Sequence, residues 1–185
     1  MRIDRGIVLA AGASKRLGSH KALIEVEGQT LVQLVCSKLQ SAGLSVTVVT
    51  RNSLKQKIEN LLPNVSTVVN PNPELGRTGT IQRGIESIGT GPLLIIPVDR
   101  PGFSLETINL LCKTNTTTIP TYEQKGGHPI AITSQDCENI MQAEPDIPLR
   151  ELISPERMHV EDPYLHLNID TKEDVNQLIK VAKHL

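Results

Sequence analysis

The chain has 185 residues, with 19 Lys and Arg against 20 Asp and Glu, so its formal net charge is -1. This length suits one domain around one hydrophobic core, and we expect a single domain over residues 1–185. A nearly neutral chain has no general attraction for nucleic acid or for an anionic membrane. An aromatic content of 2% is too low for a protein that stacks bases on aromatic rings. We therefore expect no nucleic acid and no membrane as partners.

The cysteines and the start of the chain indicate a compartment. Cys36, Cys112 and Cys137 are far apart and lack metal-ligand spacing, so we interpret them as reduced and mostly buried thiols. The first five residues lead into an apolar run without the features of a signal peptide. No apolar run approaches the roughly 20 residues of a membrane-spanning helix. These observations predict a cytoplasmic protein.

Short apolar runs alternate with amphipathic stretches through the first 111 residues. Strands are expected at 3–11, 45–50, 65–69 and 93–98, and helices around 31–42, 54–62, 81–88 and 105–111. The runs 3–11 and 93–98 are nearly continuous, which is typical of strands buried on both faces of a sheet. Asn52 or Ser53 is expected to cap the second helix, and Ser104 the fourth. This alternation predicts parallel strands joined by right-handed crossovers.

The pattern becomes less regular after Thr114. The expected elements are strands at 116–122 and 127–133 around a turn at 124–126, short helices near 134–142 and 148–153, and a strand around 158–168. A last helix should open at Thr171, because Thr171-x-x-Asp174 resembles a capping box. Its expected buried face consists of Val175, Leu178, Ile179 and Ala182. The predicted fold class is α/β, Rossmann-like and three-layered, with a mostly parallel sheet and a small antiparallel extension.

The first chemical signal follows the first predicted strand. It is the segment Leu9-Ala10-Ala11-Gly12-Ala13-Ser14-Lys15-Arg16-Leu17-Gly18, with Lys21 three residues further on. Small residues let successive backbone N–H groups approach a phosphate chain, and Lys15, Arg16 and Lys21 add positive charge. The spacing is neither that of a Walker A loop nor that of a dinucleotide fingerprint. The alternative is a glycine-rich turn with surface lysines.

Two aspartates are candidate ligands of a hard cation. Asp99, within Pro97-Val98-Asp99-Arg100-Pro101, follows the predicted strand 93–98, where a carboxylate could hold Mg²⁺ against substrate phosphates. Asp170, just before the last helix, could supply a second carboxylate. The alternatives are ordinary ones, because Asp is also common in turns and at helix N-termini.

Two loops could complete a site. The loop 70–78 is longer than a typical connection and runs into a helix, where Thr78 and Thr80 would suit a base or phosphate contact. In Gly126-Gly127-His128-Pro129, His128 could be a general base or could lie beside a second substrate in a tight turn. The other histidines, His20, His159, His166 and His184, are interpreted as surface or structural residues.

From Leu9 to about Val175 the motifs resemble those of the MobA-like nucleotidyltransferases. Residues 9–21 are similar to the family's Leu-Ala-Ala-Gly-x-Ser-x-Arg-Met-Gly-x-x-Lys signature, with Leu17 in place of Met. Asp99 falls in the Pro-x-Asp-x-Pro motif, and residues 168–174 resemble the closing Asp-Ile-Asp-Thr-Pro-Glu-Asp. Ala11 and the Gly127-His128-Pro129 segment look most like the molybdenum-cofactor cytidylyltransferase branch.

The resemblance implies a nucleotide-diphospho-sugar transferase-like fold and transfer of NMP from an NTP to a phosphate-bearing acceptor, with release of pyrophosphate. The implied donor is CTP, the acceptor molybdopterin and the cofactor Mg²⁺. The implied catalytic residues are Arg16, Lys21 and Asp99, and the metal ligands are Asp99 and Asp170. The implied nucleotide-binding residues are Leu9, Ala10, Ala11, Gly12, Ser14, Lys15, Gly79 and Thr80. Gly127 and His128 would contact the acceptor.

Three departures from the family pattern affect these expectations. Gly76-Arg77-Thr78-Gly79-Thr80 replaces Gly-Met-Ser-x-Ser-Leu, Lys172 replaces a Pro, and Asn168 replaces the first Asp of the closing motif. Two other functions therefore remain as alternatives: transfer to a sugar 1-phosphate or another small phosphate, and a nucleotide-binding accessory domain without turnover. A dinucleotide-binding protein is disfavoured because its glycine fingerprint is missing.

Overall fold

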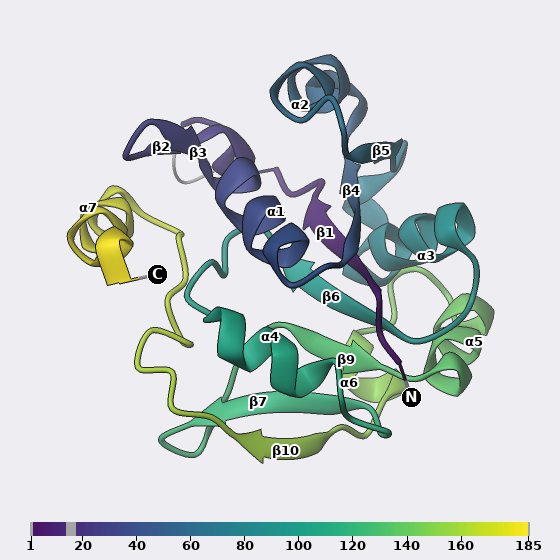
Figure 1. The fold of residues 1–185 in the computed structure, drawn as a ribbon. Coiled ribbons are helices and arrows are strands. Elements are labelled where there is room, and N and C mark those ends of the chain that lie inside the picture. The colour runs from purple at the N-terminus through teal and green to yellow at the C-terminus, as the bar shows by residue number, and fades with distance from the viewer. Residues whose placement is uncertain (1, 14–17, 185) are drawn as a thin grey trace.

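The computed structural model describes residues 2–13 and 18–184, the last of these by its backbone alone. Within these residues, eight strands form one sheet in the order β10-β7-β9-β6-β1-β4-β5, with β8 paired to β7 (Figure 1). The strands of this sheet are β1 (Arg5–Ala10), β4 (Ser45–Thr50), β5 (Ser66–Val69), β6 (Leu93–Pro97), β7 (Thr118–Tyr122), β8 (Lys125–Gly126), β9 (Ile130–Ile132) and β10 (Glu156–His159). A separate hairpin consists of β2 (Glu25–Val26) and β3 (Gln29–Thr30).

Strand direction divides the sheet into two halves. β6, β1, β4 and β5 run parallel to one another. β9 is antiparallel to both β6 and β7, and β10 returns parallel to β7. The predicted fold class is therefore confirmed: a mostly parallel sheet carries an antiparallel extension.

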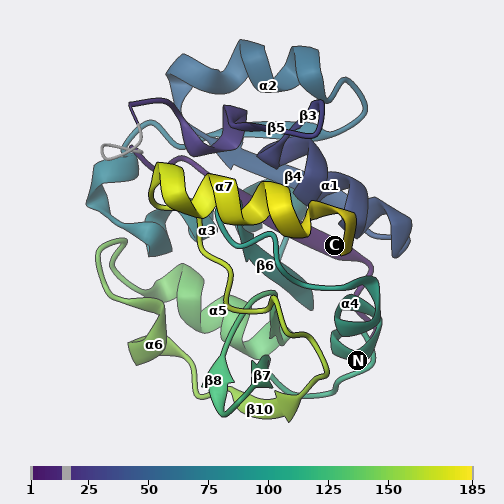
Figure 2. The same ribbon diagram turned by 90° about the vertical axis from the view of Figure 1, so that its left-hand side faces the viewer.

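Helices cover both faces of the sheet (Figures 1 and 2). They are α1 (Leu31–Ser41), α2 (Lys55–Leu61), α3 (Arg77–Ile88), α4 (Leu105–Leu111), α5 (Ser134–Gln142), α6 (Leu149–Leu152) and α7 (Lys172–Val181), with short 3-10 turns at Lys21–Leu23, Asn52–Leu54, Pro73–Leu75 and Ala182–His184. One hydrophobic cluster joins α1, α2, α4 and α7 to one face, and the other joins α3 and α5 to the opposite face. The molecule thus has three layers.

The central strands explain why their sequences lack polar alternation. In β1, Val8 packs into one cluster, while Ile7 and Leu9 pack into the other. In β6, Ile96 and Ile95 divide in the same way. Because successive side chains point to opposite faces, a strand covered on both sides must be apolar at every position.

Side-chain caps are present at the start of α4 and α7 but not at the start of α2. Ser104 caps α4, its Oγ accepting from the backbone N–H of Thr107 at 3.1 Å, and Thr171 with Asp174 forms a capping box at α7. Both predictions are confirmed. The prediction that Asn52 or Ser53 caps a helix is wrong: these residues lie inside a 3-10 turn, and neither that turn nor α2 has a side-chain cap.

The second half of the chain differs from the predictions at three places. The strand expected at 158–168 ends at His159, because the following segment turns so that Asp162 accepts hydrogen bonds from Ser104 and Thr107. The strand expected at 127–133 is confined to β9, while Lys125–Gly126 pairs with β7 as a hairpin. On α7, Leu178 is buried as expected, but Ile179 is 43% exposed.

The cysteines are largely as predicted. Cys36 and Cys137 are buried, Cys112 is partly exposed, and all three are free thiols. Burial raises the pKa of Cys36 to about 12, so its reactive thiolate form is scarce at neutral pH. Among the described residues, no helix is long and apolar enough to cross a bilayer.

Gly84 lets α3 pack closely against the sheet. A Cβ atom there would lie 2.7 Å from Cγ2 of Ile7 and 3.0 Å from Cγ2 of Val49. We expect Gly84→Val to lower the free energy of unfolding by about 2 kcal/mol or more, because a well-packed core resists added methyl groups. Urea unfolding measures the change. Glu86→Val, on the exposed side of α3, is the control, and an equal loss in both variants would contradict the packing explanation.

Candidate active site

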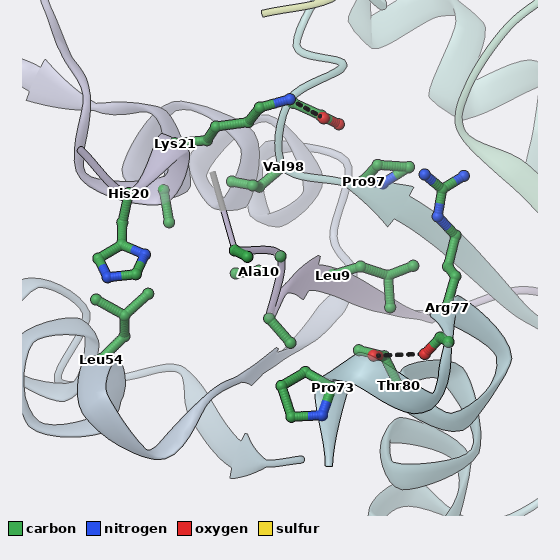
Figure 3. A pocket seen from close by; sticks show the side chains of 16 residues that line it. Leu9, Ala10, His20, Lys21, Leu54, Pro73, Arg77, Thr80, Pro97 and Val98 are labelled. Carbon is green, nitrogen blue, oxygen red and sulfur yellow. Dashed lines mark hydrogen bonds and ion pairs between the residues drawn. The ribbon is translucent and has the colours of Figure 1, made fainter. Parts of the chain in front are cut away.

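A cleft of about 320 Å³ opens where the parallel strands end. It is lined by Leu9, Ala10, Ala11, Gly12, Ala13, His20, Lys21, Ala22, Leu54, Pro73, Gly76, Arg77, Thr80, Pro97, Val98 and Asp99 (Figure 3). Open α/β sheets bind their ligands at this edge. Among the expected residues, the cleft contains Leu9 to Gly12 and Lys21 of the first loop, Asp99 after the fourth predicted strand, and Thr80 at the start of α3.

The centre of the site is a lysine between two carboxylates. Nζ of Lys21 lies 2.7 Å from Oδ2 of Asp99 and 2.5 Å from Oδ1 of Asp170. Lys21 begins the 3-10 turn after the first loop, Asp99 follows β6, and Asp170 precedes α7. A backbone hydrogen bond of 3.0 Å from the N–H of Ile169 to the carbonyl of Asp99 joins the last two segments. Three segments far apart in the sequence thus meet at one point.

The two carboxylates determine the protonation of Lys21. Burial by itself lowers the pKa of this lysine, but hydrogen bonds and charge from Asp170 and Asp99 outweigh burial and raise it. Lys21 is therefore an ammonium ion at neutral pH. The three groups together carry one net negative charge, which a bound cation can offset.

Asp170 is held in place by its neighbours. Oδ2 of Asp174 accepts from the backbone N–H groups of Asp170 and Thr171 at 2.8 and 2.7 Å. The first of these bonds is the main reason that the pKa of Asp174 is lowered. The side-chain amide of Asn168 donates to Oδ2 of Asp170. Asn168, which replaces a family aspartate, thus orients a carboxylate instead of adding one.

The carboxylate pair fits a divalent cation that is shared with a substrate. Asp99 and Asp170 direct oxygens at one positive group, and Mg²⁺ is usually bound by one or two carboxylates plus phosphate oxygens. Among the described residues, no group of three or more His, Cys, Asp or Glu could enclose a metal ion. Substrate phosphates would therefore have to supply the remaining ligands.

The first loop is held from the neighbouring strand. Nε of Arg51, just after β4, donates to the carbonyl of Ala11 at 3.0 Å, and Oγ1 of Thr50 lies 3.4 Å from the carbonyl of Ala10. The sequence analysis did not identify Arg51. The parallel pairing of Ala10 with Thr50 places the next residue, Arg51, beside the first loop. The predicted residues Ser14, Lys15 and Arg16 lie outside the described part of the chain.

The segment before α3 lines the cleft differently from the prediction. Gly76, Arg77 and Thr80 line it, and Nδ2 of Asn70 holds the Thr80 hydroxyl at 3.0 Å. Gly79 instead packs against Pro145, whose carbonyl accepts its N–H at 3.0 Å. The predicted nucleotide contact of Gly79 thus falls on a packing position, where a Cβ atom would lie 2.9 Å from Cβ of Pro145.

Thr78 is also engaged in packing. Its hydroxyl donates to the carbonyl of Ile147 at 2.5 Å, and its side chain is buried. Thr78 was a candidate for a base or phosphate contact because it lies near a helix N-terminus. Its hydroxyl proton is instead donated to Ile147. In this structure the hydroxyl fixes the segment 145–147 against α3.

Gly127 and His128 lie beside the end of β6. They precede β9, which pairs antiparallel with β6 through Ile130 and Ile95. His128 is partly exposed, yet its Nδ1 atom is buried and has no hydrogen-bond partner among the described residues. Burial, followed by the charges of Arg100 and Arg77, lowers the pKa of His128 to about 4 against an opposing effect of Asp99. The imidazole is therefore neutral at pH 7.

His20, interpreted from the sequence as a surface or structural residue, lies at the cleft. Its side chain lines the cleft, and its ring lies near Leu54 (Figure 3). Its Nδ1 atom is buried without a hydrogen-bond partner in the described part of the chain. His159 and His166 have partners outside the cleft, in Glu161 and the carbonyl of Tyr122, and the side chain of His184 is outside the described atoms.

A partly buried lysine holds the loop that follows Asp99. Nζ of Lys38 donates to the carbonyls of Pro101 and Phe103 at 2.8 and 2.9 Å. Burial lowers its pKa to about 8, partly opposed by the charge of Asp162. Lys38 thus connects α1 to the loop that carries Asp99 and Arg100.

Lys38 should make stability depend on pH. Because its pKa falls from 10.5 to about 8 on folding, the unfolded chain binds more protons than the folded chain between these values. Stability therefore rises with pH in this window. Relative to Lys38→Met, the wild type should gain about 3 kcal/mol at most. Urea unfolding of both proteins from about pH 7 to pH 10 measures this gain, and a constant difference would contradict it.

Fold and site together define a class. A parallel sheet whose carboxyl edge carries a glycine-containing loop, a lysine and two convergent carboxylates is typical of α/β proteins that bind phosphate-containing ligands. The model of the MobA-like NTP transferase domain matches residues 6–161. The chain belongs to the MobA-like NTP transferase family.

Curated relatives match part of the chain. It is 31% identical over 111 residues to a protein of Bacillus mycoides (strain KBAB4) named probable molybdenum cofactor guanylyltransferase, a match that covers 57% of this chain and 54% of that relative. A protein of the same name from Bacillus cereus (strain Q1) is 32% identical over 109 residues, with the same coverage. The chain thus spans about half the length of the curated relatives it matches.

Solved structures match nearly the whole fold. The homologue of Mycobacterium tuberculosis rv0371c from Mycobacterium sp. strain JC1 has a TM-score of 0.84 at 21% identity, covering 100% of this chain and 99% of its own. Molybdopterin-guanine dinucleotide biosynthesis protein A from Archaeoglobus fulgidus has a TM-score of 0.74 at 16% identity, covering 98% and 100%. Rv0371C from M. tuberculosis, in complex with manganese, has a TM-score of 0.79 at 16% identity, covering 97% and 99%. The TM-scores show that these proteins share the fold of this chain.

Proposed function

We propose that this protein transfers a nucleotidyl group from an NTP to the phosphate of a molybdopterin-type acceptor, with release of pyrophosphate and with the help of a divalent cation. The observation that carries the proposal is the convergence of Asp99 and Asp170 on Lys21, at the cleft that Lys21 and Asp99 line. The names of the Bacillus relatives support the acceptor. The manganese complex of a protein with the same fold supports a divalent cation. We place the reaction in the cytoplasm, within a single domain of residues 1–185.

In this proposal, one set of residues binds the metal ion and another binds the donor NTP. Asp99 and Asp170 would hold the cation, proposed to be Mg²⁺, which when bound neutralises phosphate oxygens and aligns the reacting groups. Lys21, with Arg16 from the first loop, would offset charge on the donor phosphates. The backbone of residues 9–12 would contact the base, and Thr80 would close over it.

The acceptor needs little activation by the protein. A phosphate monoester has a second pKa of about 6, so its oxygen is already largely ionised at neutral pH. A strong general base is therefore unnecessary, and His128, with its pKa near 4, would act by hydrogen bonding. Catalysis then rests on positioning and on charge neutralisation.

Two observations point to different donor bases. Ala11 in the first loop favours CTP by its resemblance to the cytidylyl branch, whereas the names of the Bacillus relatives favour GTP. Thermal melts with CTP, GTP, ATP and UTP, each with Mg²⁺ or Mn²⁺, distinguish these donors. An NTP at 100 times its dissociation constant should stabilise the fold by about 2.7 kcal/mol.

Turnover is then tested as pyrophosphate release with molybdopterin and with a sugar 1-phosphate. Release with molybdopterin alone supports the proposal. Release only with the sugar 1-phosphate would reassign the acceptor. Stabilisation by an NTP without any release would indicate a nucleotide-binding accessory domain. A protein that no NTP stabilises would refute the proposal.

A further inference from the structure

We propose that Arg77, Arg100 and His128 form the subsite that holds the phosphate group of the acceptor. The inference rests on the proposed function and adds two arginines that the family motifs do not assign. Arg77 stands where the family pattern has Met, and Arg100 occupies the variable position between Asp99 and Pro101.

The fold brings these three residues to the same end of β6. Arg100 directly follows Asp99, and the β6–β9 pairing brings His128 to the same end of the sheet. Arg77 lines the cleft with Pro97 and Asp99. In Figure 3 the side chain of Arg77 extends from the start of α3 toward Pro97. The charges of Arg100, Arg77 and Asp99 also contribute to the pKa of His128, in agreement with this placement.

Neither arginine is neutralised within the described residues. The ion pairs there involve Lys21, Lys55, Arg83 and His159, and none includes Arg77 or Arg100. Arg83, two turns into the same helix, pairs with Glu86 at 2.7 Å. A guanidinium presents donors in a fork that matches two phosphate oxygens. Two such groups beside a cleft therefore provide charge and geometry for a phosphate dianion.

His128 supplies an independent indication of a ligand. Its Nδ1 atom is removed from solvent and lacks a hydrogen-bond partner, an arrangement that costs free energy unless something satisfies it. The neutral ring can donate one hydrogen bond to a phosphate oxygen without adding charge. Gly127 lets the segment before His128 pack closely against Leu165, because a Cβ atom at Gly127 would lie 2.5 Å from Cγ of Leu165.

The position of the subsite favours the acceptor over the donor. The donor residues Leu9 to Gly12 lie at the end of β1 and just after it, whereas His128 belongs to the antiparallel half, on the other side of β6. Asp99 lies at the boundary between the two halves. A phosphate held by Arg77, Arg100 and His128 would therefore lie across the metal-binding carboxylates from the donor.

Phosphate binding tests the subsite without turnover. Inorganic phosphate is titrated into protein saturated with Mg²⁺ and a non-hydrolysable NTP analogue, while the His128 ring protons are followed by NMR. We expect these signals to shift in the wild type, and we expect Arg77→Gln/Arg100→Gln to weaken phosphate at least tenfold. The variant should keep NTP affinity within about twofold. His128→Gln should weaken phosphate to a lesser degree.

Arg83→Gln on the same helix is the matched control and should leave both affinities unchanged. Unaltered phosphate affinity in the double variant would overturn the subsite. An equal loss of NTP and phosphate affinity would assign the arginines to the donor and would also overturn it. Thermal melts of each variant exclude unfolding as the cause. Failure of NTP binding or of pyrophosphate release in the wild type would concern the proposed function, which the phosphate titration does not measure.

Discussion

Asp99→Asn is expected to lower kcat at least about 100-fold, which corresponds to about 2.7 kcal/mol of lost transition-state stabilisation. Asp99 is both a partner of Lys21 at 2.7 Å and the proposed metal ligand just after β6. An amide has nearly the same shape but lacks the charge that binds a hard cation. The backbone bond from Ile169 uses the Asp99 carbonyl and is unaffected, so the fold should persist.

Steady-state kinetics and thermal melts with an NTP and Mn²⁺ measure this effect. The variant should melt near the wild-type temperature without ligands and should lose most of its metal-dependent stabilisation by the NTP. Asp4→Asn is the matched control, because Asp4 is exposed and precedes β1 at the opposite end of that strand. Turnover within tenfold of the wild type would remove Asp99 from the metal site.

Lys21→Met should separate metal binding from turnover. Without the ammonium ion, Asp99 and Asp170 lose the cation that lies 2.7 and 2.5 Å away. Two partly buried carboxylates would then repel each other, since opposite charge no longer compensates them. We expect the variant to melt lower than the wild type without metal and to bind Mn²⁺ more tightly without nucleotide. Its kcat should fall by about 100-fold, because charge on the donor phosphates is no longer offset.

Calorimetric titration with Mn²⁺, together with melts with and without the metal, checks this prediction. Lys55→Met is the control, since Lys55 is exposed and pairs only with Glu59, at 3.8 Å. Unchanged Mn²⁺ affinity in Lys21→Met would show that the lysine does not compete with metal for the two carboxylates. Wild-type turnover in the same variant would remove Lys21 from the phosphate contacts.

The two predictions together assign the charges of the site. In Asp99→Asn a ligand is lost, so metal and nucleotide binding should weaken together. In Lys21→Met a competing cation is lost, so metal binding should strengthen while turnover falls. Opposite changes in Mn²⁺ affinity therefore distinguish a metal site from a salt bridge that only stabilises the fold.

Local sequence was sufficient for much of the fold. The continuous apolar runs that became β1 and β6 are buried on both faces, and such strands must be apolar at every residue. Ser104 and Thr171 could be recognised as caps because capping depends on side chains within three residues. The strand expected at 158–168 failed for a non-local reason, since Asp162 is used to hold Ser104 and Thr107.

Part of the site was also accessible from the sequence. Lys21, Asp99 and Asp170 belong to motifs whose residue types indicate phosphate and metal chemistry. Their meeting was not accessible, because Lys21 is 78 residues from Asp99 and 149 from Asp170. Nothing in either segment alone specifies such a contact.

Local sequence patterns were enough to identify the helices and strands and the kinds of side chain at their ends. Only the tertiary structure decided that Gly79 packs on Pro145, that His20 lines the cleft, and that Arg77 extends toward the end of β6. The physical reason is that propensity, capping and periodicity act over a few residues. The position of a side chain relative to a cleft depends on how distant elements pack.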